Sequence, residues 1–309
     1  MKTLVITPTY NEAETVTSLI PRILAVECSG RSIDVLVIDD ASPDGTGDVV
    51  AAMARTDERI HLLRRPRKLG LGTAYAEGFR FALERNYELI VQMDADLSHN
   101  PRYLPEFFRK VSEFDLVVGS RYLQGISIVN WPFWRLAVSY FGNFLARRLT
   151  GVPLTDLTSG YKCFRIEILK GMDLDRLRCS GYGFQIEFAY RTRERGFRVG
   201  EIPIIFVERY GGQSKMTVAI AVEALFLIIR LWCSRALRAF EGTALQGSSR
   251  KRPAHLPPVA AETHRNALSD GVIAGIKASR LRHHDVALPE IEEAVEEHVA
   301  RPRTSTGAR

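Results

Sequence analysis

Residues 91–96, Val91-Gln92-Met93-Asp94-Ala95-Asp96, place two carboxylates one residue apart after a short apolar run. The apolar part predicts a buried strand, which ends where the turn sequence LSHNP follows at 97–101. Carboxylates at the carboxyl end of a strand lie at the mouth of an α/β sheet, where ligands bind. Mg²⁺ and Mn²⁺ favour such oxygens and often share them with substrate phosphates. The stretch therefore predicts a site for a metal-chelated diphosphate such as a nucleotide sugar; its alternative is a solvated acidic turn.

Apolar runs alternate with helix-like stretches along the first 120 residues. The expected strands are residues 4–7, 35–38, 60–63, 89–93 and 116–119, and the expected helices are 12–26, 46–54, 72–85 and 103–111. Continuous apolar strands between helices are typical of a parallel sheet that is covered on both faces. We therefore expect an α/β fold with a Rossmann-like, mainly parallel sheet.

The bulk composition narrows the class of protein. With 309 residues, 46% hydrophobic and 25% charged, the chain is long enough for one large globular domain plus an appendage. Four scattered cysteines without metal-type spacing predict reduced thiols in a cytosolic protein. The chain starts directly with a strand, so we expect no secretory signal and a catalytic face on the cytoplasmic side. A formal charge of +6 suits an anionic partner, but its sign alone does not choose among phosphate, nucleic acid and lipid headgroups.

Two helical segments have the composition of membrane-surface helices. Residues 131–150 are rich in aromatic residues and arginine, which fits either a packed helix or one at a membrane interface. The apolar run at 218–232 is shorter than the roughly 18–20 residues that span a bilayer, and Glu223 and Arg230 interrupt it. It predicts an amphipathic helix that lies on a membrane, with docking on the protein's own core as the alternative.

The composition changes again near Gln246, where a Gly-, Ser-, Pro- and charge-rich segment begins. Its lack of an apolar period predicts a disordered tail that is dispensable for chemistry. The expected organisation is a catalytic domain at 1–216, an amphipathic membrane-interface helix at 217–240 and a disordered tail at 241–309.

Polar motifs recur at successive strand ends. PTYNE at 8–12 would aim Tyr10 and Glu12 at the sheet mouth, although Asn11 equally suits a capped helix start. The paired carboxylates Asp39 and Asp40 follow the second strand and suit nucleoside recognition. The basic, Gly-containing loop at 64–72 opens a helix and could meet phosphate, or remain solvated. Each motif alone is weak, but chance seldom places them together.

In combination the motifs resemble the inverting GT-A glycosyltransferases of family 2, and more narrowly the dolichol-phosphate (polyprenol-phosphate) mannose synthases. The resemblance rests on PTYNE at 8–12, DDASPDGT at 39–46, MDADLSH at 93–99 and GSRY at 119–122. NWPFWR at 130–135, TSGY at 158–161 and RYGGQSK at 209–215 extend it, so that it covers roughly residues 1–240. It implies a GT-A fold and a dolichyl-phosphate β-D-mannosyltransferase, which moves mannose from GDP-mannose to a polyprenyl (dolichyl) monophosphate with inversion.

The resemblance also implies roles for individual residues. Guanosine would be held by Pro8, Tyr10, Glu12, Ile38 and Asp40, and the ribose, diphosphate and mannose by Asp94, Ala95 and Asp96. Asp96 would ligate Mg²⁺ or Mn²⁺, with Ser98 as a shorter ligand that could act through water. Phosphate contacts would come from Arg121, Arg135, Arg209 and Lys215, and the catalytic set would be Asp96, Arg121, Arg209 and Lys215.

The chemistry that the resemblance implies needs no strong general base. A phosphate monoester has a second pKa of about 6, so the acceptor oxygen is already anionic near pH 7. This fits the lack of an obvious catalytic histidine, and we expect His61 and His99 to be structural. Asp156 aligns near a family aspartate and would orient the acceptor or the sugar, or cap a loop.

Three alternatives remain open from the sequence. A polyprenyl-phosphate glucosyl or hexosyl transferase would use a UDP-sugar, but such enzymes often carry two C-terminal transmembrane helices, which this sequence lacks. A nucleotidyltransferase would normally show a Gly-rich phosphate loop where this chain has PTYNE. The third alternative is a non-catalytic membrane-associated scaffold. The expected partners are GDP-mannose, polyprenyl phosphate and the cytoplasmic face of a membrane, bound peripherally; an integral membrane anchor protein is compatible with this, and no nucleic acid is expected.

Overall fold

A seven-stranded sheet forms the centre of the protein in a computed structural model that describes residues 1–28, 30–129, 131–176, 181–207 and 218–244. The strand order is β3-β2-β1-β4-β7-β5-β8. The strands are β1 (Lys2–Thr9), β2 (Ser32–Asp39), β3 (Ile60–Arg64), β4 (Leu89–Gln92), β5 (Leu116–Ser120), β7 (Lys162–Arg165) and β8 (Val199–Pro203). All neighbours pair in parallel except β7, which runs antiparallel between β4 and β5. The predicted α/β fold with a mainly parallel sheet is therefore confirmed.

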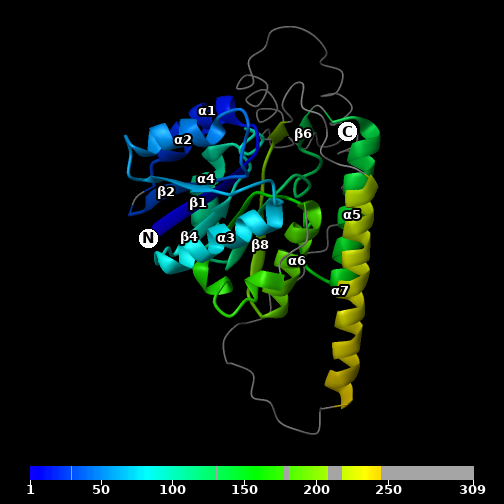
Figure 1. The fold of residues 1–309 in the computed structure, drawn as a ribbon. Coiled ribbons are helices and arrows are strands. Elements are labelled where there is room, and N and C mark those ends of the chain that lie inside the picture. Colours follow the sequence, from blue (N-terminus) through cyan, green and yellow to red (C-terminus); the bar gives the residue numbers. More distant parts are fainter. Residues whose placement is uncertain (29, 130, 177–180, 208–217, 245–309) are drawn as a thin grey trace, which may run out of the picture.

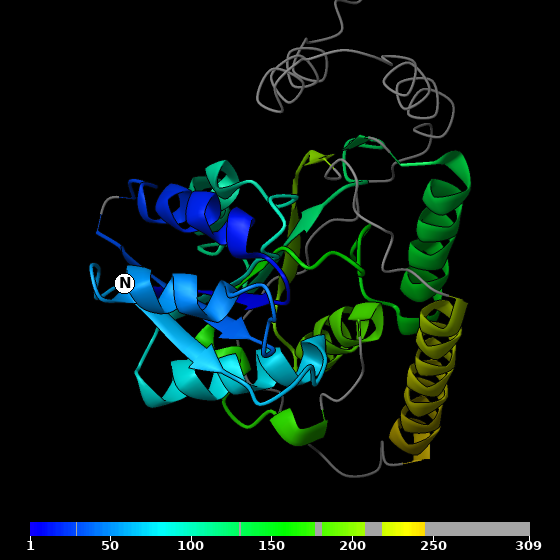
Figure 2. The same ribbon diagram turned by 45° about the horizontal axis from the view of Figure 1, so that its top comes forward.

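Helices cover both faces of this sheet (Figure 1). One face carries α1 (Ala13–Leu24), α2 (Thr46–Ala54) and α4 (Leu104–Lys110), and the other carries α3 (Leu71–Glu84) and α6 (Gly181–Glu194). The long helices α5 (Phe133–Thr150) and α7 (Val218–Ala244) lie at the side of the molecule far from α1 and α2 (Figures 1 and 2). Short 3₁₀ turns occur at η1 (Pro101–Tyr103), η2 (Ile166–Ile168) and η3 (Leu174–Arg176), and a parallel pair joins β6 (Ile128–Val129) to β9 (Phe206–Val207).

The apolar strands explain the two core layers. In β2, Val35 and Val37 are buried against α1 and α2, while Leu36 and Ile38 are buried against α3. Successive side chains of a strand point to opposite faces, so a continuous apolar run serves two cores. Gly78 of α3 permits close packing on the second face, because a Cβ there would lie 2.8 Å from Ile6 and 2.9 Å from Ile38.

The direction of β7 determines which residues reach the sheet mouth. The parallel strands β1, β2, β4 and β5 end there, and β7 begins there because it runs the opposite way. Residues 158–161, which precede β7, therefore join the loops that follow the parallel strands. The sequence analysis did not predict β7 or this reversal.

The helix α7 docks on the protein and also exposes apolar side chains. Leu227, Ile228 and Leu231 are buried in the core shared with α3 and α6, whereas Phe226 and Trp232 are exposed. Docking on the protein's own core, the alternative predicted from the sequence, therefore applies to Leu227, Ile228 and Leu231, while other apolar side chains of α7 stay exposed. No helix within the described ranges has both the length and the hydropathy to cross a bilayer. Of the predicted tail at 241–309, residues 241–244 belong to the end of α7, and residues 245–309 lie outside the described residues.

Candidate active site

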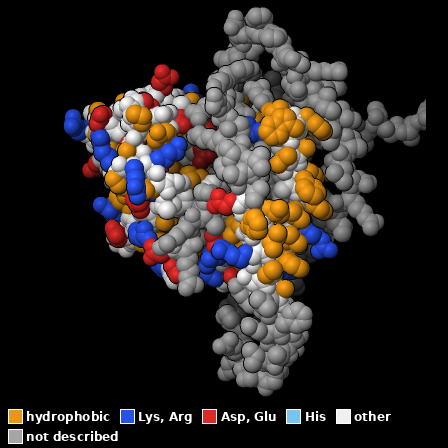
Figure 3. Space-filling model, turned by 45° about the vertical axis from the view of Figure 1, so that its right-hand side comes forward, with side chains coloured by type: hydrophobic (Ala, Val, Ile, Leu, Met, Phe, Trp, Pro, Cys, Tyr) orange, Lys and Arg blue, Asp and Glu red, His pale blue; other side chains and the backbone are white. Residues whose placement is uncertain are grey.

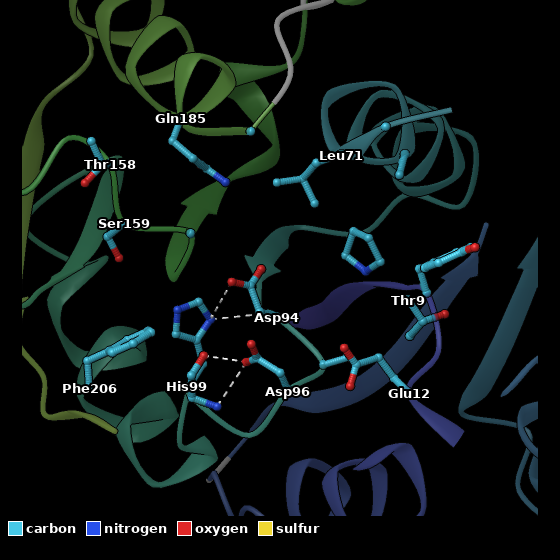
Figure 4. Close-up of a pocket in the computed structure, with 18 of the residues that line it drawn as sticks. Thr9, Glu12, Leu71, Asp94, Asp96, His99, Thr158, Ser159, Gln185 and Phe206 are labelled. Carbon is cyan, nitrogen blue, oxygen red and sulfur yellow. Dashed lines mark hydrogen bonds and ion pairs between the residues drawn. The ribbon is translucent and has the colours of Figure 1, made fainter. Parts of the chain in front are cut away.

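A cavity of about 480 Å³ opens at the mouth of the sheet (Figure 4). Its floor is the end of β4, and its walls come from the loops after β1, β2 and β5, from α3 and α6, and from the segment before β7. The predicted site residues that line it are Pro8, Tyr10, Glu12, Asp40, Asp94, Ala95, Asp96, Ser98, Arg121 and Arg135. The fold thus brings together residues that lie up to 127 positions apart in the sequence, from Pro8 to Arg135.

One end of the cavity is built by Pro8, Tyr10, Glu12, Asp40 and Lys68, and we call it the nucleotide half after the ligand predicted for it from the sequence. Lys68 places its Nζ 3.9 Å from the centroid of the Tyr10 ring. An aromatic face beside a cation suits a planar base or a phosphate.

The loops after β1 and β2 hold one another in place. Thr46 Oγ1 accepts a hydrogen bond from the backbone N–H of Glu12 at 3.0 Å, and Asp44 Oδ2 accepts one from Ala13 at 3.0 Å. Through these contacts the loop after β2 supplies hydrogen-bond acceptors for backbone N–H groups at the start of α1. Asn11 does not cap the helix as its sequence position had suggested, because it takes a left-handed conformation with φ of 60°.

The basic loop at 64–72 is held by a buried ion-pair network. Arg65 lies 2.7 Å from Asp40 Oδ1 and 3.2 Å from Glu77 Oε1, and its side chain is almost fully buried. The loop therefore uses Arg65 to orient Asp40 and does not present it to phosphate, whereas Lys68 and Gly70 do line the cavity.

Ile38 does not line the cavity. Its side chain is fully buried in the core beside Gly78, because residue 38 points to the α3 face of β2. The predicted contact of Ile38 with guanosine is therefore not one that its side chain makes, and it stays a prediction for the backbone of this residue. Asp39 also points inward, where Oδ1 accepts hydrogen bonds from Thr9 and Ser42.

The carboxylates after β4 are oriented by the turn that follows them. Ser98 donates to Asp96 Oδ1 through both its backbone N–H, at 3.2 Å, and its hydroxyl. His99 Nδ1 accepts from the backbone N–H of Asp94 at 3.0 Å. Leu97, in the middle of this turn, adopts a left-handed φ of 64°. The turn brings Ser98 to the carboxylate of Asp96 and the His99 ring to the backbone N–H of Asp94.

His99 lines the cavity, and its contacts fit the structural role predicted for it. Its ring is buried and stacks on Tyr161 at 4.8 Å between centroids. Burial lowers the pKa of His99, although the neighbouring carboxylates Asp94 and Asp96 oppose that shift. The imidazole is therefore neutral near pH 7 and holds the Asp94 backbone through Nδ1.

The carboxylates fit a divalent cation that shares its coordination with a ligand. The Asp94 side chain is 39% exposed to the cavity, and Gly160 leaves room for it, since a Cβ there would lie 3.3 Å from Oδ2. Within the described residues no three His, Cys, Asp or Glu side chains gather into a metal-binding group. Oxygen donors from one or two carboxylates plus phosphate are the usual Mg²⁺ environment. Ser98 supports Asp96 directly, so the geometry favours that role over metal ligation.

The other end of the cavity contains Arg121 and Arg135, and we call it the acceptor half after the phosphate contacts predicted for these residues from the sequence. Arg121 makes a two-pronged ion pair with Asp156, with Nε–Oδ2 at 2.6 Å and Nη2–Oδ1 at 2.8 Å. Burial by itself raises the pKa of Asp156, but the charge and hydrogen bonds of Arg121 outweigh it and hold the pKa below its usual value. Asp156 is fully buried and does not line the cavity, so its role is to position Arg121 and not to touch the sugar or acceptor.

Aromatic rings pack around the two arginines. Arg135 lies 4.0 Å from the Trp131 ring centroid, and Arg121 lies 5.4 Å from Trp131 and 5.5 Å from Phe206. Both arginines are more than 90% buried yet still line the cavity. The rings fix the guanidinium planes and leave a basic end that suits an anionic group.

Two predicted phosphate ligands, Arg209 and Lys215, lie outside the described residues. Conversely, the cavity includes residues that the sequence analysis did not select, namely Lys68, Trp131, Thr158, Ser159, Gly160, Gln185 and Phe206. The TSGY motif at 158–161 was a usable signal for three of them. Gln185 lies inside a helix and carried no such signal.

Comparisons with known proteins agree with this architecture. The profile of the family described as Glycosyl transferase family 2 matches residues 4–172. The chain is 46% identical over 231 residues to an undecaprenyl-phosphate mannosyltransferase of Micrococcus luteus, covering 74% of this chain and 93% of that protein. It is 42% identical over 229 residues to a polyprenol monophosphomannose synthase of Mycolicibacterium smegmatis, covering 74% and 85%.

A solved structure of lower sequence similarity shares the fold. Glucosyl-3-phosphoglycerate synthase from Mycobacterium tuberculosis, in complex with Mn²⁺, uridine diphosphate and phosphoglyceric acid, superposes with a TM-score of 0.58 at 16% identity. The match covers 75% of this chain and 78% of that chain.

Proposed function

The chain belongs to glycosyl transferase family 2, and from this premise we propose that it transfers mannose from GDP-mannose to a polyprenyl monophosphate. The product is a polyprenyl-phosphate β-mannose, formed with inversion at the anomeric carbon. One observation carries the proposal: the Asp94 and Asp96 carboxylates lie between an aromatic, acidic end and a basic end of one cavity. The mannosyltransferase names of the two similar proteins support the same reaction.

The nucleotide half would bind the donor. Tyr10 offers a ring for stacking on guanine, and Glu12 and Asp40 offer acceptors for base or ribose donors. Asp94 and Ala95 would lie along the ribose and diphosphate. The identity of the base as guanine rests on the resemblance to polyprenol-phosphate mannose synthases, so the donor is the first thing to test.

Asp96, held by Ser98, would bind a divalent cation together with the donor diphosphate. The cation, Mg²⁺ or Mn²⁺, would supply charge stabilisation for the leaving GDP. The structural neighbours solved with Mn²⁺ support a divalent metal without selecting between the two.

The acceptor half would bind the lipid phosphate. Arg121 and Arg135 place positive charge at the basic end, and we keep Arg209 and Lys215 as further proposed contacts. These groups would align the anionic phosphate oxygen on the face of the anomeric carbon opposite the leaving diphosphate. No side chain needs to remove a proton, which agrees with the buried, hydrogen-bonded state of His99.

An apolar surface on α5 and α7 would bring this site to the membrane. Phe133, Trp134, Phe141 and Phe144 on α5 and Phe226 and Trp232 on α7 are each 47–70% exposed. Figure 3, viewed toward these helices, shows hydrophobic side chains gathered along this side of the molecule. Such a surface suits peripheral binding at the cytoplasmic face of a bilayer, alone or beside an integral anchor protein.

Transfer of labelled mannose from GDP-mannose to polyprenyl phosphate, followed by solvent extraction, tests the proposal. We expect label in the lipid with Mg²⁺ or Mn²⁺ and none with a chelator. Absence of lipid label from every donor and polyprenyl phosphate in reconstituted membranes would overturn the proposed reaction.

A second candidate is a polyprenyl-phosphate hexosyl transferase that uses a UDP-sugar. Glucosyl-3-phosphoglycerate synthase, which shares this fold, has been solved with UDP-glucose bound. This supports a UDP-sugar as the alternative donor. Running UDP-glucose beside GDP-mannose separates the two, because label from UDP-glucose alone would replace the donor and keep the chemistry.

A further inference from the structure

Lys162 is a buried lysine directly beneath the cavity, and the proposed chemistry gives it no role. It opens β7, its side chain is fully buried, and its Nζ donates to the carbonyl of Ser159 and to Oε1 of Gln185. Both acceptors belong to residues that line the cavity. A buried amine that holds two groups of a binding site indicates a role in shaping that site.

The contact with Lys162 determines which way the Gln185 amide points. An ammonium group has three donors and no acceptor, so only the carbonyl oxygen of an amide can face it. The structure has this direction, since Lys162 Nζ donates to Gln185 Oε1. The Gln185 Nε2 is consequently turned away from Lys162. Figure 4 shows the end of the Gln185 side chain directed into the cavity.

That Nε2 group is a buried donor without a hydrogen-bond partner among the described residues. Gln185 is only 2% exposed, but it lines the cavity. An unpaired buried donor destabilises the folded protein, and natural folds seldom keep one without a reason. A ligand oxygen that reaches this end of the cavity would complete the hydrogen bond.

The position of Gln185 identifies which part of the donor would reach it. Figure 4 shows Gln185 across the cavity from Thr9 and Glu12, with Asp94 between them. A nucleotide sugar is linear: the nucleoside leads to the diphosphate, and the diphosphate leads to the hexose. With the nucleoside at Glu12 and the diphosphate at the carboxylates, the hexose extends toward Gln185.

We propose that Gln185 donates a hydrogen bond from Nε2 to a hydroxyl oxygen of the donor hexose, and that Lys162 is the positioning residue that orients this amide. The inference rests on the proposed function in requiring a nucleotide-sugar donor, but it does not depend on the lipid acceptor. It assigns hexose recognition to a residue of α6, a helix that contributes nothing to the nucleotide half.

The test compares a nucleotide with its sugar-carrying form. For the full-length wild type we would measure the dissociation constants of GDP and GDP-mannose with Mg²⁺, and take their ratio as the contribution of the hexose. Gln185→Glu keeps the acceptor for Lys162 and removes the Nε2 donor, and Gln185→Met serves if that variant does not fold. Lys162→Met removes the orienting amine. Arg193→Gln, exposed on the same helix, is the matched control.

We expect the GDP/GDP-mannose ratio of dissociation constants to fall about 10-fold in the Gln185 and Lys162 variants, as for a broken buried hydrogen bond. GDP affinity should stay unchanged, and Arg193→Gln should match the wild type. An unchanged ratio in folded Gln185 variants, or an equal loss for GDP and GDP-mannose, would overturn the hexose contact. A normal ratio in Lys162→Met, with loss in the Gln185 variants, would overturn the positioning role.

The same experiment separates this inference from the proposed donor. If the wild type binds UDP and UDP-glucose but not the guanosine ligands, the proposed donor is wrong. The ratio is then measured with the uridine pair in the same variants, where it tests the Gln185 contact as before.

Discussion

The two halves of the cavity are built in different ways. The nucleotide half comes from short motifs that follow β1 and β2 and from the loop before α3, so each motif lies beside the strand end that places it. The acceptor half collects Arg121, Trp131, Arg135 and Phe206 from separate segments, and a buried ion pair and ring contacts fix its arginines. The first half depends mainly on strand topology, and the second depends on pairings between distant residues. Substitutions should therefore affect the two halves differently.

The largest effect is expected where the halves meet. Asp96→Ala removes the proposed cation ligand and should lower mannosyl transfer about 1000-fold, since a cation supplies several kcal/mol of charge stabilisation to a leaving phosphate. The free energy of unfolding should change little because the carboxylate faces the cavity. Single-turnover transfer at saturating substrates measures this loss, and Asp48→Ala, an exposed carboxylate of α2, is the control. A wild-type transfer rate in Asp96→Ala would show that this carboxylate has no role in the reaction.

Asp156→Asn tests the buried pairing of the acceptor half. It leaves the buried Arg121 charge uncompensated, so the free energy of unfolding at pH 7 should fall by about 3 kcal/mol. The folded-state pKa of Asp156 lies below its usual value, so this stabilisation exists above the unfolded pKa and is lost as pH falls through the folded pKa. The difference between wild type and variant in urea unfolding should therefore shrink in acid.

The exposed pair Asp57 and Arg59 provides the matched control for that measurement. Asp57→Asn removes a carboxylate from an ion pair of 2.6 Å that lies at the surface. Solvent screens such pairs, so the loss should be below about 1 kcal/mol. Equal losses in Asp57→Asn and Asp156→Asn would show that burial does not determine how much the ion pair between Arg121 and Asp156 contributes to the free energy of unfolding.

The apolar surface beside the acceptor half should affect membrane binding and little else. The double variant Phe141→Ser and Phe226→Ser should weaken binding to anionic vesicles about 10-fold or more, from the lost transfer of two aromatic side chains. Its thermal midpoint should stay close to that of the wild type, because both side chains are exposed. Vesicle co-sedimentation measures the effect, with Leu123→Ser as an exposed apolar control. Unchanged sedimentation would argue that another surface meets the membrane.

The smallest effect is expected in the nucleotide half. Tyr10→Ala removes the ring beside Lys68 and should weaken GDP binding about 5-fold, as one stacking or cation–π contact is worth roughly 1 kcal/mol. Isothermal titration with Mg²⁺ measures this loss. Affinity equal to that of the wild type would place the base elsewhere in the cavity.

The difference between the halves also explains what the sequence could predict. Strand periodicity and turn residues are local, so the alternating elements up to Ser120 and the strand-end motifs Tyr10, Glu12, Asp40, Asp94 and Asp96 were predictable. The antiparallel β7 was not, because its sequence Lys162-Cys163-Phe164-Arg165 lacks the continuous apolar run that marks the equally short β4.

The missed features are those that require knowledge of long-range contacts. From the sequence, Arg121 and Asp156 were predicted to contact the substrates separately. In the fold they pair with each other across 35 residues. Ile38 matched a family position, but its strand face turns the side chain into the core. Lys162 and Gln185 meet across 23 residues and showed no motif that linked them.

The central claim is that the nucleotide half binds the donor and the acceptor half binds the lipid phosphate. The most direct test measures KM for GDP-mannose and for polyprenyl phosphate separately in Tyr10→Ala and Arg135→Gln. The predicted result is a crossed pattern, in which Tyr10→Ala raises only the donor KM and Arg135→Gln raises only the acceptor KM. If each variant raised both values alike, or Arg135→Gln raised only the donor KM, the assignment of the two halves would be wrong.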